Sequence, residues 1–461
     1  MTRVPVTVIG GGLAGAEAAH LLSRAGVRVR LFEKRPLKST PAHSTGNLAE
    51  LVCSNSLGAD SASSPAGILK QEMRAMGSLV MKCADSSRVP AGKALAVDRD
   101  IFSSLVSGAI LDDGNIEVLR REAVKIPETP AIIAAGPLMD GGIAEDVSGM
   151  IGEGCLSFFD AAAPIVTLES VDMSRVYRAD RYGGGEGDYV NCPMDRERYE
   201  AFYEALIGAE RALTHEPGER PGYFEGCLPI EVMASRGIDT MRFGPLRPVG
   251  LPDPSTGREP WAVVQLRRDN REDTLYNLVG FQTNLKFPEQ ERVFRMIPAL
   301  ENAEFVRKGV MHRNSFVRAP RALDGYLRPA RDGRAVRQDL FLAGQITGVE
   351  GYTESAAIGA VSAIFMLYVL SGAPMPEFPE TTAVGSLLKY LKEAEPDSFQ
   401  PMNVNLGIFP KIEPGGRRKK LTKPERCAAC AERSLRDMRA FLESQKLLQS
   451  FIAHAANSPW N

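Results

Sequence analysis

Two of the seven cysteines, Cys53 and Cys227, stand in local sequences that suit a reactive thiol. Cys53 lies in the stretch AELVCSNSLGAD, between an apolar Leu-Val pair and a run of small polar residues, so it fits neither a core strand nor a disulfide framework. In the stretch FEGCLPIE, a glycine precedes Cys227 and a proline follows two residues later, which predicts a turn that presents the thiol. Thiols in such settings act as nucleophiles or transfer protons.

The remaining cysteines have weaker signals. Free cysteines are common as small buried residues, and we interpret Cys83, Cys155 and Cys192 in this way. Cys427 and Cys430 form one C-x-x-C in a stretch that predicts a helix, and no second pair or histidine lies at zinc spacing, so we predict no metal site. An odd number of cysteines without a secretory signal predicts reduced thiols in a cytoplasmic protein.

A strand, a helix and a second strand are predicted in the N-terminal stretch VPVTVIGGGLAGAEAAHLLSRAGVRVRLFEKR. Apolar residues favour strands at 4–9 and 27–32, and the segment between them, at about 13–24, has the pattern of a helix. This order is that of a βαβ unit, which predicts an α/β fold.

Gly10, Gly12 and Gly15 give this unit the G-x-G-x-x-G spacing of a dinucleotide-binding turn. The first glycine allows a tight turn, the second lets the backbone approach a pyrophosphate, and the third lets the helix and strand pack closely. Phosphate is then expected at the N-terminus of the helix. Glu33 follows Gly15 by 18 residues, near the spacing of an acid that holds the ribose hydroxyls. The alternative is a glycine turn in a plain α/β domain.

A second glycine-rich turn occurs late in the chain, in DLFLAGQITGVEGYTESAAIGAVSAIFMLYVL. This stretch predicts a strand, the turn and a long apolar helix. It resembles the element with which flavoproteins of the two-dinucleotide-binding-domain type hold the flavin pyrophosphate and ribityl chain, which points to FAD and not NAD as the resident cofactor. The apolar run at 356–370 is shorter than the ~20 residues needed to cross a bilayer, so we interpret it as a buried helix and expect no membrane span.

These elements predict a doubly wound, Rossmann-like FAD-binding fold with an inserted α+β domain and a helical C-terminal tail. The FAD-binding domain is expected at 1–182 and 319–372, the inserted domain at 183–318, and the helical region at 373–461. A composition of 44% hydrophobic and 24% charged residues is typical of an ordinary globular protein.

Two arginine-rich tracts are candidates for RNA contact. One, at 311–338, interleaves seven arginines with aromatic residues and contains His312, the only histidine among basic and polar neighbours; the other is GGRRKKLTKPER, at 415–426. Arginines pair with phosphates and stack on bases, although such runs are also typical of a solvated surface. The formal net charge of −2 excludes a uniformly positive surface, so any RNA binding must be local.

Long motifs throughout nearly the whole chain resemble the folate- and FAD-dependent tRNA (uracil-5-)-methyltransferases. Among them are GGGLAGAEAAHLL, LFEKRPLKSTPAHSTGNLAELVCSNSL, YVNCPMDRERYEAFYEAL, FEGCLPIEVMASRG, LYNLVGFQTNLK and LFLAGQITGVEGYTESAA. The stretch beyond about Lys411, which includes the C-x-x-C, lies outside this resemblance.

The resemblance implies a methyltransferase that forms 5-methyluridine in the tRNA T-loop (position 54) with the one-carbon unit of 5,10-methylenetetrahydrofolate. Reduced FAD would supply the electrons and NAD(P)H would restore it, so the implied partners are the tRNA T-arm, folate and NAD(P)H. The implied FAD-binding residues are Gly10, Gly11, Gly12, Leu13, Ala14, Gly15, Glu33, Asn47, Gly344, Gln345, Gly348 and Glu350.

By this resemblance, Cys53 and Cys227 correspond to the reactive cysteines of the tRNA (uracil-5-)-methyltransferases. A thiolate that adds to C6 of uracil makes C5 nucleophilic, and a second thiol can remove the C5 proton. We expect Cys227 to be the nucleophile and Cys53 its acid-base partner near the flavin ring, and the reverse assignment stays open. The uridine must leave its loop to reach the site, at a cost of about a few kcal/mol.

Three alternatives compete with this function. The same chemistry can act on a uridine of ribosomal RNA. A flavin oxidoreductase for a small molecule would use the two thiols as a redox pair. An FAD-stabilised RNA-binding or folding factor would need the arginine tracts and not the cysteines.

Overall fold

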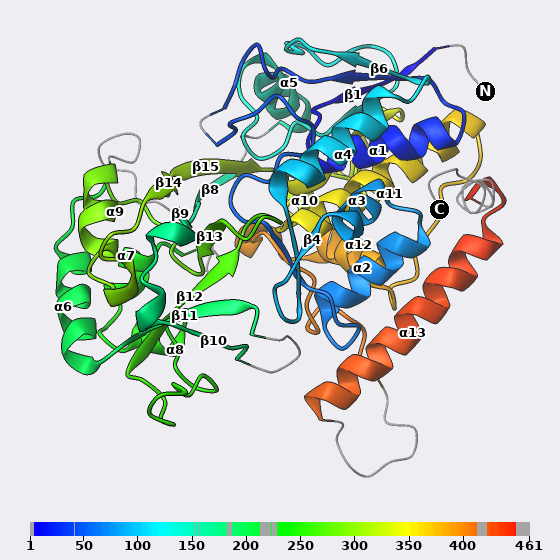
Figure 1. Ribbon diagram of the computed structural model, residues 1–461. Coiled ribbons are helices and arrows are strands. Elements are labelled where there is room, and N and C mark those ends of the chain that lie inside the picture. Colours follow the sequence, from blue (N-terminus) through cyan, green and yellow to red (C-terminus); the bar gives the residue numbers. More distant parts are fainter. Residues whose placement is uncertain are drawn as a thin grey trace.

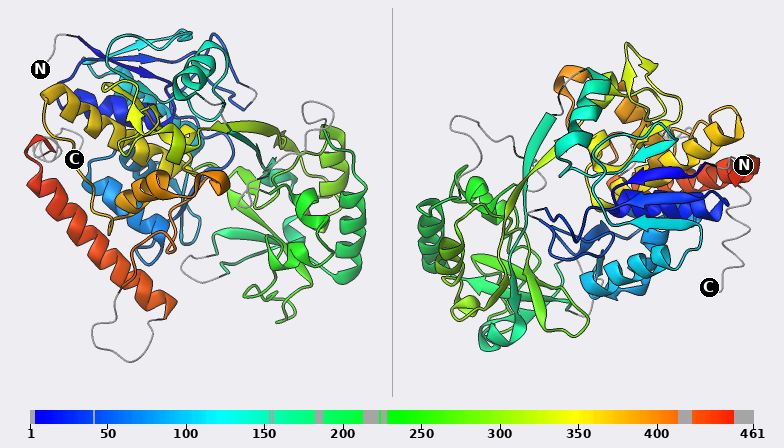
Figure 2. Two further views of the ribbon diagram at one scale, coloured as in Figure 1. Left: turned by 180° about the vertical axis from the view of Figure 1, so that it is seen from behind. Right: turned by 90° about the horizontal axis from the view of Figure 1, so that it is seen from above.

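The computed structural model describes residues 4–40, 42–152, 154, 156–181, 187–212, 223, 228–412 and 422–448. In Figure 1 they form a larger body, which holds the N-terminal elements and the last helices, and a smaller body made of the middle of the chain. An antiparallel ribbon of β8 (Leu156–Ala161) and β15 (Met311–Phe316) runs between the two bodies. Figure 2 shows the same connection from behind and from above.

A parallel sheet in the order β18-β7-β1-β2-β6 is the centre of the larger body. Its strands are β1 (Val6–Ile9), β2 (Val29–Phe32), β6 (Ile116–Leu119), β7 (Ala131–Ile133) and β18 (Leu340–Leu342). All residues of β1, β7 and β18 are buried, as expected for parallel strands covered on both faces. The predicted Rossmann-like α/β fold is therefore confirmed. The second strand begins at Val29, two residues later than expected.

Two helices cross on this sheet with their backbones in contact. Helix α1 (Leu13–Arg24) has the predicted bounds, and the late apolar run forms α11 (Tyr352–Ser371). A Cβ atom on Gly359 of α11 would lie 2.3 Å from the carbonyl oxygen of Ala14 of α1, so only glycine allows this crossing. Among the described residues, α11 alone has the length and hydropathy of a membrane span, but 83% of its apolar window is buried inside the protein.

The smaller body is built on a second, antiparallel sheet in the order β10-β11-β12-β13-β9-β14. Its strands are β9 (Ile165–Thr167), β10 (Tyr177–Arg178), β11 (Tyr189–Met194), β12 (Ala262–Arg268), β13 (Leu275–Leu278) and β14 (Phe305–Arg307). Helices α6 (Arg196–Ile207), α7 (Ile230–Ala234), α8 (Thr240–Phe243) and α9 (Phe287–Phe294) complete it. Its apolar residues form a core separate from that of the larger body.

The sheet of the smaller body includes strands that precede the expected start of the inserted domain at residue 183. Strand β9 pairs with β13 and β14, and β10 pairs with β11, although both lie before that residue. At the other end, β15 belongs to the connecting ribbon and not to this sheet. By these hydrogen bonds, the boundaries between the two bodies lie near residues 162 and 310. The sequence did not indicate the first of these boundaries, because the short strands β9 and β10 carry no glycine or composition signal that marks it.

The other elements surround the two sheets. In the larger body these are β3 (Ser56–Ala59), β4 (Arg88–Val89), β5 (Ala94–Val97), β16 (Ala330–Arg331), β17 (Arg334–Ala335), α2 (Pro65–Ala75), α3 (Leu79–Ser86), α4 (Arg99–Leu111), α5 (Gly141–Ile151), α10 (Ala319–Ala322), α12 (Ala383–Glu393) and α13 (Lys423–Ser444). Short 3-10 helices are η1 (Leu168–Ser170), η2 (Met173–Arg175), η4 (Pro298–Leu300), η5 (Gly344–Thr347) and η6 (Pro396–Ser398).

The C-terminal helices are attached through a buried carboxylate. Glu72 of α2 accepts hydrogen bonds from the backbone N–H groups of Ala383 and Val384 at the start of α12, and from the hydroxyl of Ser434 of α13. Both cysteines of the C-x-x-C, Cys427 and Cys430, are buried on α13. No group of three or more metal-ligating side chains occurs within the described part of the chain.

We predict that Gly359→Ala destabilises the protein. The added Cβ would overlap Ala14, at a cost of about 1–3 kcal/mol that the better helix propensity of alanine, about 1 kcal/mol, offsets only in part. The measurement is the thermal unfolding midpoint. Gly149→Ala in α5 is the control, because no atom lies within 4 Å of the new Cβ there, and its midpoint should stay equal or rise. Equal midpoints for both variants would contradict the proposed helix contact.

Candidate active site

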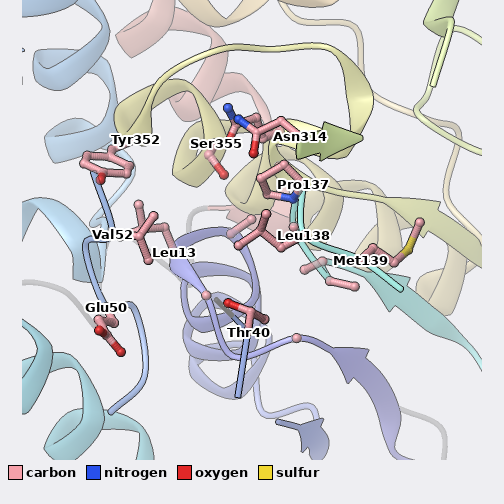
Figure 3. Close-up of a pocket in the computed structure, with 18 of the residues that line it drawn as sticks. Leu13, Thr40, Glu50, Val52, Pro137, Leu138, Met139, Asn314, Tyr352 and Ser355 are labelled. Carbon is pink, nitrogen blue, oxygen red and sulfur yellow. The ribbon is translucent and has the colours of Figure 1, made fainter. Parts of the chain in front are cut away.

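A cavity of about 550 Å³ opens at the carboxyl ends of the parallel strands. This is the edge at which doubly wound sheets bind their ligands, and the volume is in the usual range for a cofactor or substrate site. Figure 3 shows that Leu13 of α1, Thr40, Val52, Asn314 of β15 and Tyr352 of α11 surround one common space. Segments far apart in the sequence therefore build this site together.

The first glycine turn has the geometry expected of a phosphate cradle. Gly10 has a φ of 105°, which other residues rarely adopt. A Cβ on Gly15 would lie 1.8 Å from the carbonyl oxygen of Gly10, so this glycine lets α1 start directly against the turn. Gly11 lies against Glu33 and Leu48, where a Cβ would also be too close.

Gly12 is the position that tests the fit of a pyrophosphate. It is the N-cap of α1 with a φ of −74°, an ordinary value for any residue, and no side chain caps the helix there. A Cβ on Gly12 would meet no protein atom within 4 Å, so the protein itself does not require glycine. The residue lines the cavity at a helix N-terminus, where phosphate binds well. An FAD pyrophosphate against Gly12 accounts for this glycine.

Glu33 is held in place by the protein. Its carboxylate accepts hydrogen bonds from the backbone N–H of Gly11 at 3.1 Å and from the guanidinium of Arg35 at 3.0 Å, and Arg35 also pairs with Glu50. Burial pushes the pKa of Glu33 up, but the hydrogen bonds and charge of Arg35 prevail and lower it. An ionised carboxylate in the cavity wall suits the predicted contact with ribose hydroxyls.

The late glycine turn also contributes to the cavity wall. Gly344, Gln345 and Glu350 line the cavity, as do Leu13 and Ala14 from the first turn. Gln345 donates a hydrogen bond from Nε2 to Glu350 at 2.6 Å. Burial and the charge of Asp160 raise the pKa of Glu350 to about 8, so this carboxyl is mostly protonated at neutral pH.

Three of the expected FAD-binding residues do not line the cavity. Asn47 instead donates its amide to Ser103 of α4 at 3.2 Å. Gly348 ends η5 with a φ of 92°, and a Cβ there would lie 2.5 Å from the ring of Phe399, so its role is in packing. Gly15 also acts through packing. Sequence spacing alone does not distinguish a glycine that faces a ligand from one that faces the protein.

Cys53 lines the cavity and contacts Tyr352. Its sulfur lies 2.9 Å from the Tyr352 hydroxyl, which also accepts hydrogen bonds from the backbone N–H groups of Cys53 and Ser54. Burial and the charge of Asp160 raise the pKa of the Cys53 thiol to about 12, so the group is protonated at neutral pH. Cys227 lies outside the described residues, as does Cys155.

The segment that carries Cys53 also joins the two bodies. Arg267 of β12 donates to the hydroxyl of Ser54 at 2.8 Å, and Arg307 of β14 donates to the carbonyl oxygen of Val52 at 2.6 Å. Both arginines belong to the smaller body, whereas the cysteine segment belongs to the cavity wall of the larger one. The smaller body is therefore hydrogen-bonded directly to the cavity segment that carries Cys53.

The connecting ribbon adds a polar cluster that the sequence did not indicate as a unit. Asp160 of β8 lies opposite His312 of β15, with 3.7 Å between a carboxylate oxygen and Nε2, and Asn314 lies 3.5 Å from the same oxygen. All three are buried and line the cavity. Within the described part of the chain, His312 Nδ1 and Asn314 Oδ1 have no hydrogen-bond partner. Only His312 had a recognisable sequence context.

Much of the first arginine tract serves internal contacts. Arg321 pairs with Asp397, Arg328 pairs with Asp324, and Arg337 pairs with Asp339. Arg331 donates to carbonyl oxygens of α5. Residues 415–421 of the second tract lie outside the described residues. These contacts give the first arginine tract a structural role in the larger body, alongside any role in RNA contact.

Comparison with known proteins gives consistent results. The family model described as "Glucose inhibited division protein A" matches residues 5–374. A methylenetetrahydrofolate--tRNA-(uracil-5-)-methyltransferase TrmFO from Desulforudis audaxviator is 54% identical over 438 residues, which cover 95% of this chain and 98% of that protein. The protein of the same name from Moorella thermoacetica is 56% identical over 409 residues, 88% of this chain and 92% of that one. Aquifex aeolicus GidA superposes with a TM-score of 0.67 at 16% identity, over 98% of this chain and 78% of that one.

The parallel sheet, the glycine cradle at its carboxyl edge and the second glycine turn before α11 define a Rossmann-like flavoprotein. With the GidA model matching most of the chain, and relatives above 50% identity along nearly its full length, the chain belongs to the folate- and FAD-dependent tRNA (uracil-5-)-methyltransferase family.

We predict that Gly12→Ala loses FAD without losing the fold. The backbone accepts alanine there, but the new methyl group would occupy the space next to a bound phosphate, which should weaken FAD binding at least ~10-fold. Flavin absorbance after gel filtration measures FAD content, and circular dichroism checks the fold. Gly108→Ala in α4, where a Cβ also meets nothing, should keep its FAD. Normal FAD affinity in Gly12→Ala would contradict this cradle.

We further predict a steep pH dependence for alkylation of Cys53 in the wild-type protein. Only the thiolate reacts, and below the pKa its fraction rises ~10-fold per pH unit. With a pKa of about 12, the iodoacetamide rate at Cys53 should rise from about pH 7 to about pH 10 without reaching a plateau. Mass spectrometry of the peptide separates Cys53 from the other cysteines. A plateau below about pH 9 would show that the thiol is not shielded as described.

Proposed function

We propose that the protein is a cytoplasmic methyltransferase that forms 5-methyluridine in the tRNA T-loop, with 5,10-methylenetetrahydrofolate as the one-carbon donor. The observation that carries this proposal is that Cys53 lines the same cavity as the glycine cradle and the late glycine turn. A reactive thiol beside a flavin site is what the chemistry requires. The relatives named as tRNA (uracil-5-)-methyltransferases support this assignment of substrate over ribosomal RNA.

The reaction replaces the proton on C5 of uracil with a methyl group. Addition of a thiolate to C6 makes C5 nucleophilic, and C5 then bonds to the methylene carbon of the folate. Loss of the C5 proton breaks the bond from this carbon to the folate nitrogen, so tetrahydrofolate leaves and an exocyclic methylene remains on C5. Addition of a hydride to that methylene gives the methyl group and expels the thiolate from C6. The carbon arrives at the methylene level, so two electrons must be added. When bound, reduced FAD supplies these electrons, and we assign its restoration to NAD(P)H.

The remaining steps are assigned to two thiols. We assign the nucleophile to Cys227, which lies outside the described residues, and proton transfer to Cys53. The Cys53 thiol, protonated at rest, would give its proton to the departing folate nitrogen, and the resulting thiolate would accept the C5 proton. Gly10 to Ala14, Glu33, Gly344 and Gln345 would hold FAD. The unpartnered ring nitrogen of His312 and the amide oxygen of Asn314 offer hydrogen bonds to the polar edge of a heterocycle, which both uracil and a pterin possess.

We predict that the purified protein methylates a tRNA T-arm transcript with methylenetetrahydrofolate and NADPH, and that Cys53→Ala and Cys227→Ala each reduce the rate at least ~100-fold. Each change removes a group that bonds to the uracil or moves its proton. Methyl incorporation from labelled folate measures the rate. The variants Cys83→Ala in the larger body and Cys192→Ala in the smaller body are controls. Each removes a buried thiol that has no assigned role, so each variant should retain most of the activity.

Two further arms separate the alternatives. A ribosomal RNA fragment in place of the T-arm tests the other RNA substrate, and NADPH oxidation without RNA or folate tests a small-molecule oxidoreductase. With fluorouridine in the transcript, only the nucleophilic cysteine forms a stable covalent RNA adduct. Full methylation by both alanine variants would refute the proposed mechanism, whereas an adduct at Cys53 would reverse the two roles.

A further inference from the structure

Tyr352 makes three contacts with the segment that carries Cys53. Its hydroxyl oxygen lies 2.9 Å from the backbone nitrogen of Cys53, 3.2 Å from the backbone nitrogen of Ser54 and 2.9 Å from the Cys53 sulfur. The tyrosine is the first residue of α11, directly after Gly351, which has a φ of 105°. The late glycine turn therefore places this hydroxyl against the thiol of Cys53.

The three contacts fix the direction of the hydroxyl proton. A tyrosine hydroxyl has one O–H donor and two lone pairs. The backbone N–H groups of Cys53 and Ser54 can only donate, so they use both lone pairs. The O–H of Tyr352 then has one partner left, the Cys53 sulfur. Burial and the charge of Cys53 raise the pKa of Tyr352 well above its ordinary value, so the hydroxyl keeps this proton.

We propose that Tyr352 is a positioning residue that donates a permanent hydrogen bond to the Cys53 sulfur and thereby directs the thiol proton into the cavity. The tyrosine proton lies between the Tyr352 oxygen and the Cys53 sulfur, so the proton on the sulfur must point in another direction. The cavity side is lined by Asp160 and Glu350. Tyr352 thus orients the neutral thiol as a proton donor and stabilises the thiolate after the proton has left. This inference rests on the proposed role of Cys53 in proton transfer.

The test is the alkylation rate of Cys53 in Tyr352→Phe at a fixed pH near 8. Loss of a hydrogen bond to the charged sulfur raises the thiol pKa, and the lower thiolate fraction, offset in part by higher intrinsic nucleophilicity, should slow alkylation roughly 3- to 12-fold. The same factor is expected with iodoacetamide and with the smaller methyl methanethiosulfonate. Altered access would affect the two reagents differently.

Two other variants make the result specific. Asp160→Asn removes the negative charge that disfavours the thiolate, so its alkylation should be faster than that of the wild-type protein. Tyr390→Phe is the matched control: its hydroxyl donates to the carbonyl of Gln400, away from the cavity, and its rate should be unchanged. Opposite shifts in Tyr352→Phe and Asp160→Asn cannot both arise from a loosened site. Circular dichroism verifies that each variant is folded.

An unchanged or faster rate in Tyr352→Phe would overturn the proposal, and so would a rate in Asp160→Asn that does not rise. The assay needs neither RNA nor folate, so it is independent of the methylation assay. Failure of the wild-type protein to methylate RNA would refute the proposed function and leave the hydrogen bond to be judged by alkylation alone.

Discussion

The site depends on the close approach of three backbone segments at the carboxyl edge of the parallel sheet. The carbonyl of Gly10 lies against Gly15, which brings the start of α1 onto the turn, and Ala14 lies against Gly359, which brings α11 onto α1. At each contact a single added methyl group would overlap the backbone. Because α1 and α11 cross here, the two glycine turns, more than 300 residues apart in sequence, face one cavity. The positions of Cys53 and Tyr352 relative to the flavin site follow from this crossing.

The local elements around the cavity could be predicted because their signals are short-range. The bounds of α1 were predicted to the residue, and the apolar run at 356–370 is the buried part of α11. Glycine spacing and strand-helix periodicity act within about 30 residues, so one sequence contains all the information. The second strand was predicted to start two residues early because Val27 is apolar and buried without being part of the ladder.

The long-range contacts could not be predicted in the same way. The contact of Tyr352 with Cys53 joins positions 299 residues apart. The polar cluster of Asp160, His312 and Asn314 forms only because β8 pairs with β15, although the smaller body lies between these strands in the sequence. Strand β9, which enters the sheet of the smaller body early, is only three residues long. The sequence made the first arginine tract a candidate for RNA contact, but ion pairs such as Arg328 with Asp324 depend on tertiary structure that composition does not contain.

The charges around Cys53 bear on the division of roles between the two thiols. Cys53 is half-buried and lines the cavity together with Asp160 and Glu350. Desolvation raises the pKa of the thiol to about 12 and that of Glu350 to about 8. Acidic side chains in such a site stay protonated, because each additional anion would be close to another and poorly solvated. A thiol in such surroundings keeps its proton at neutral pH and is therefore a poor resting nucleophile. In the proposed mechanism, the thiolate that attacks uracil would then come from a different environment, and Cys227, which lies outside the described residues, is the candidate that the sequence provides.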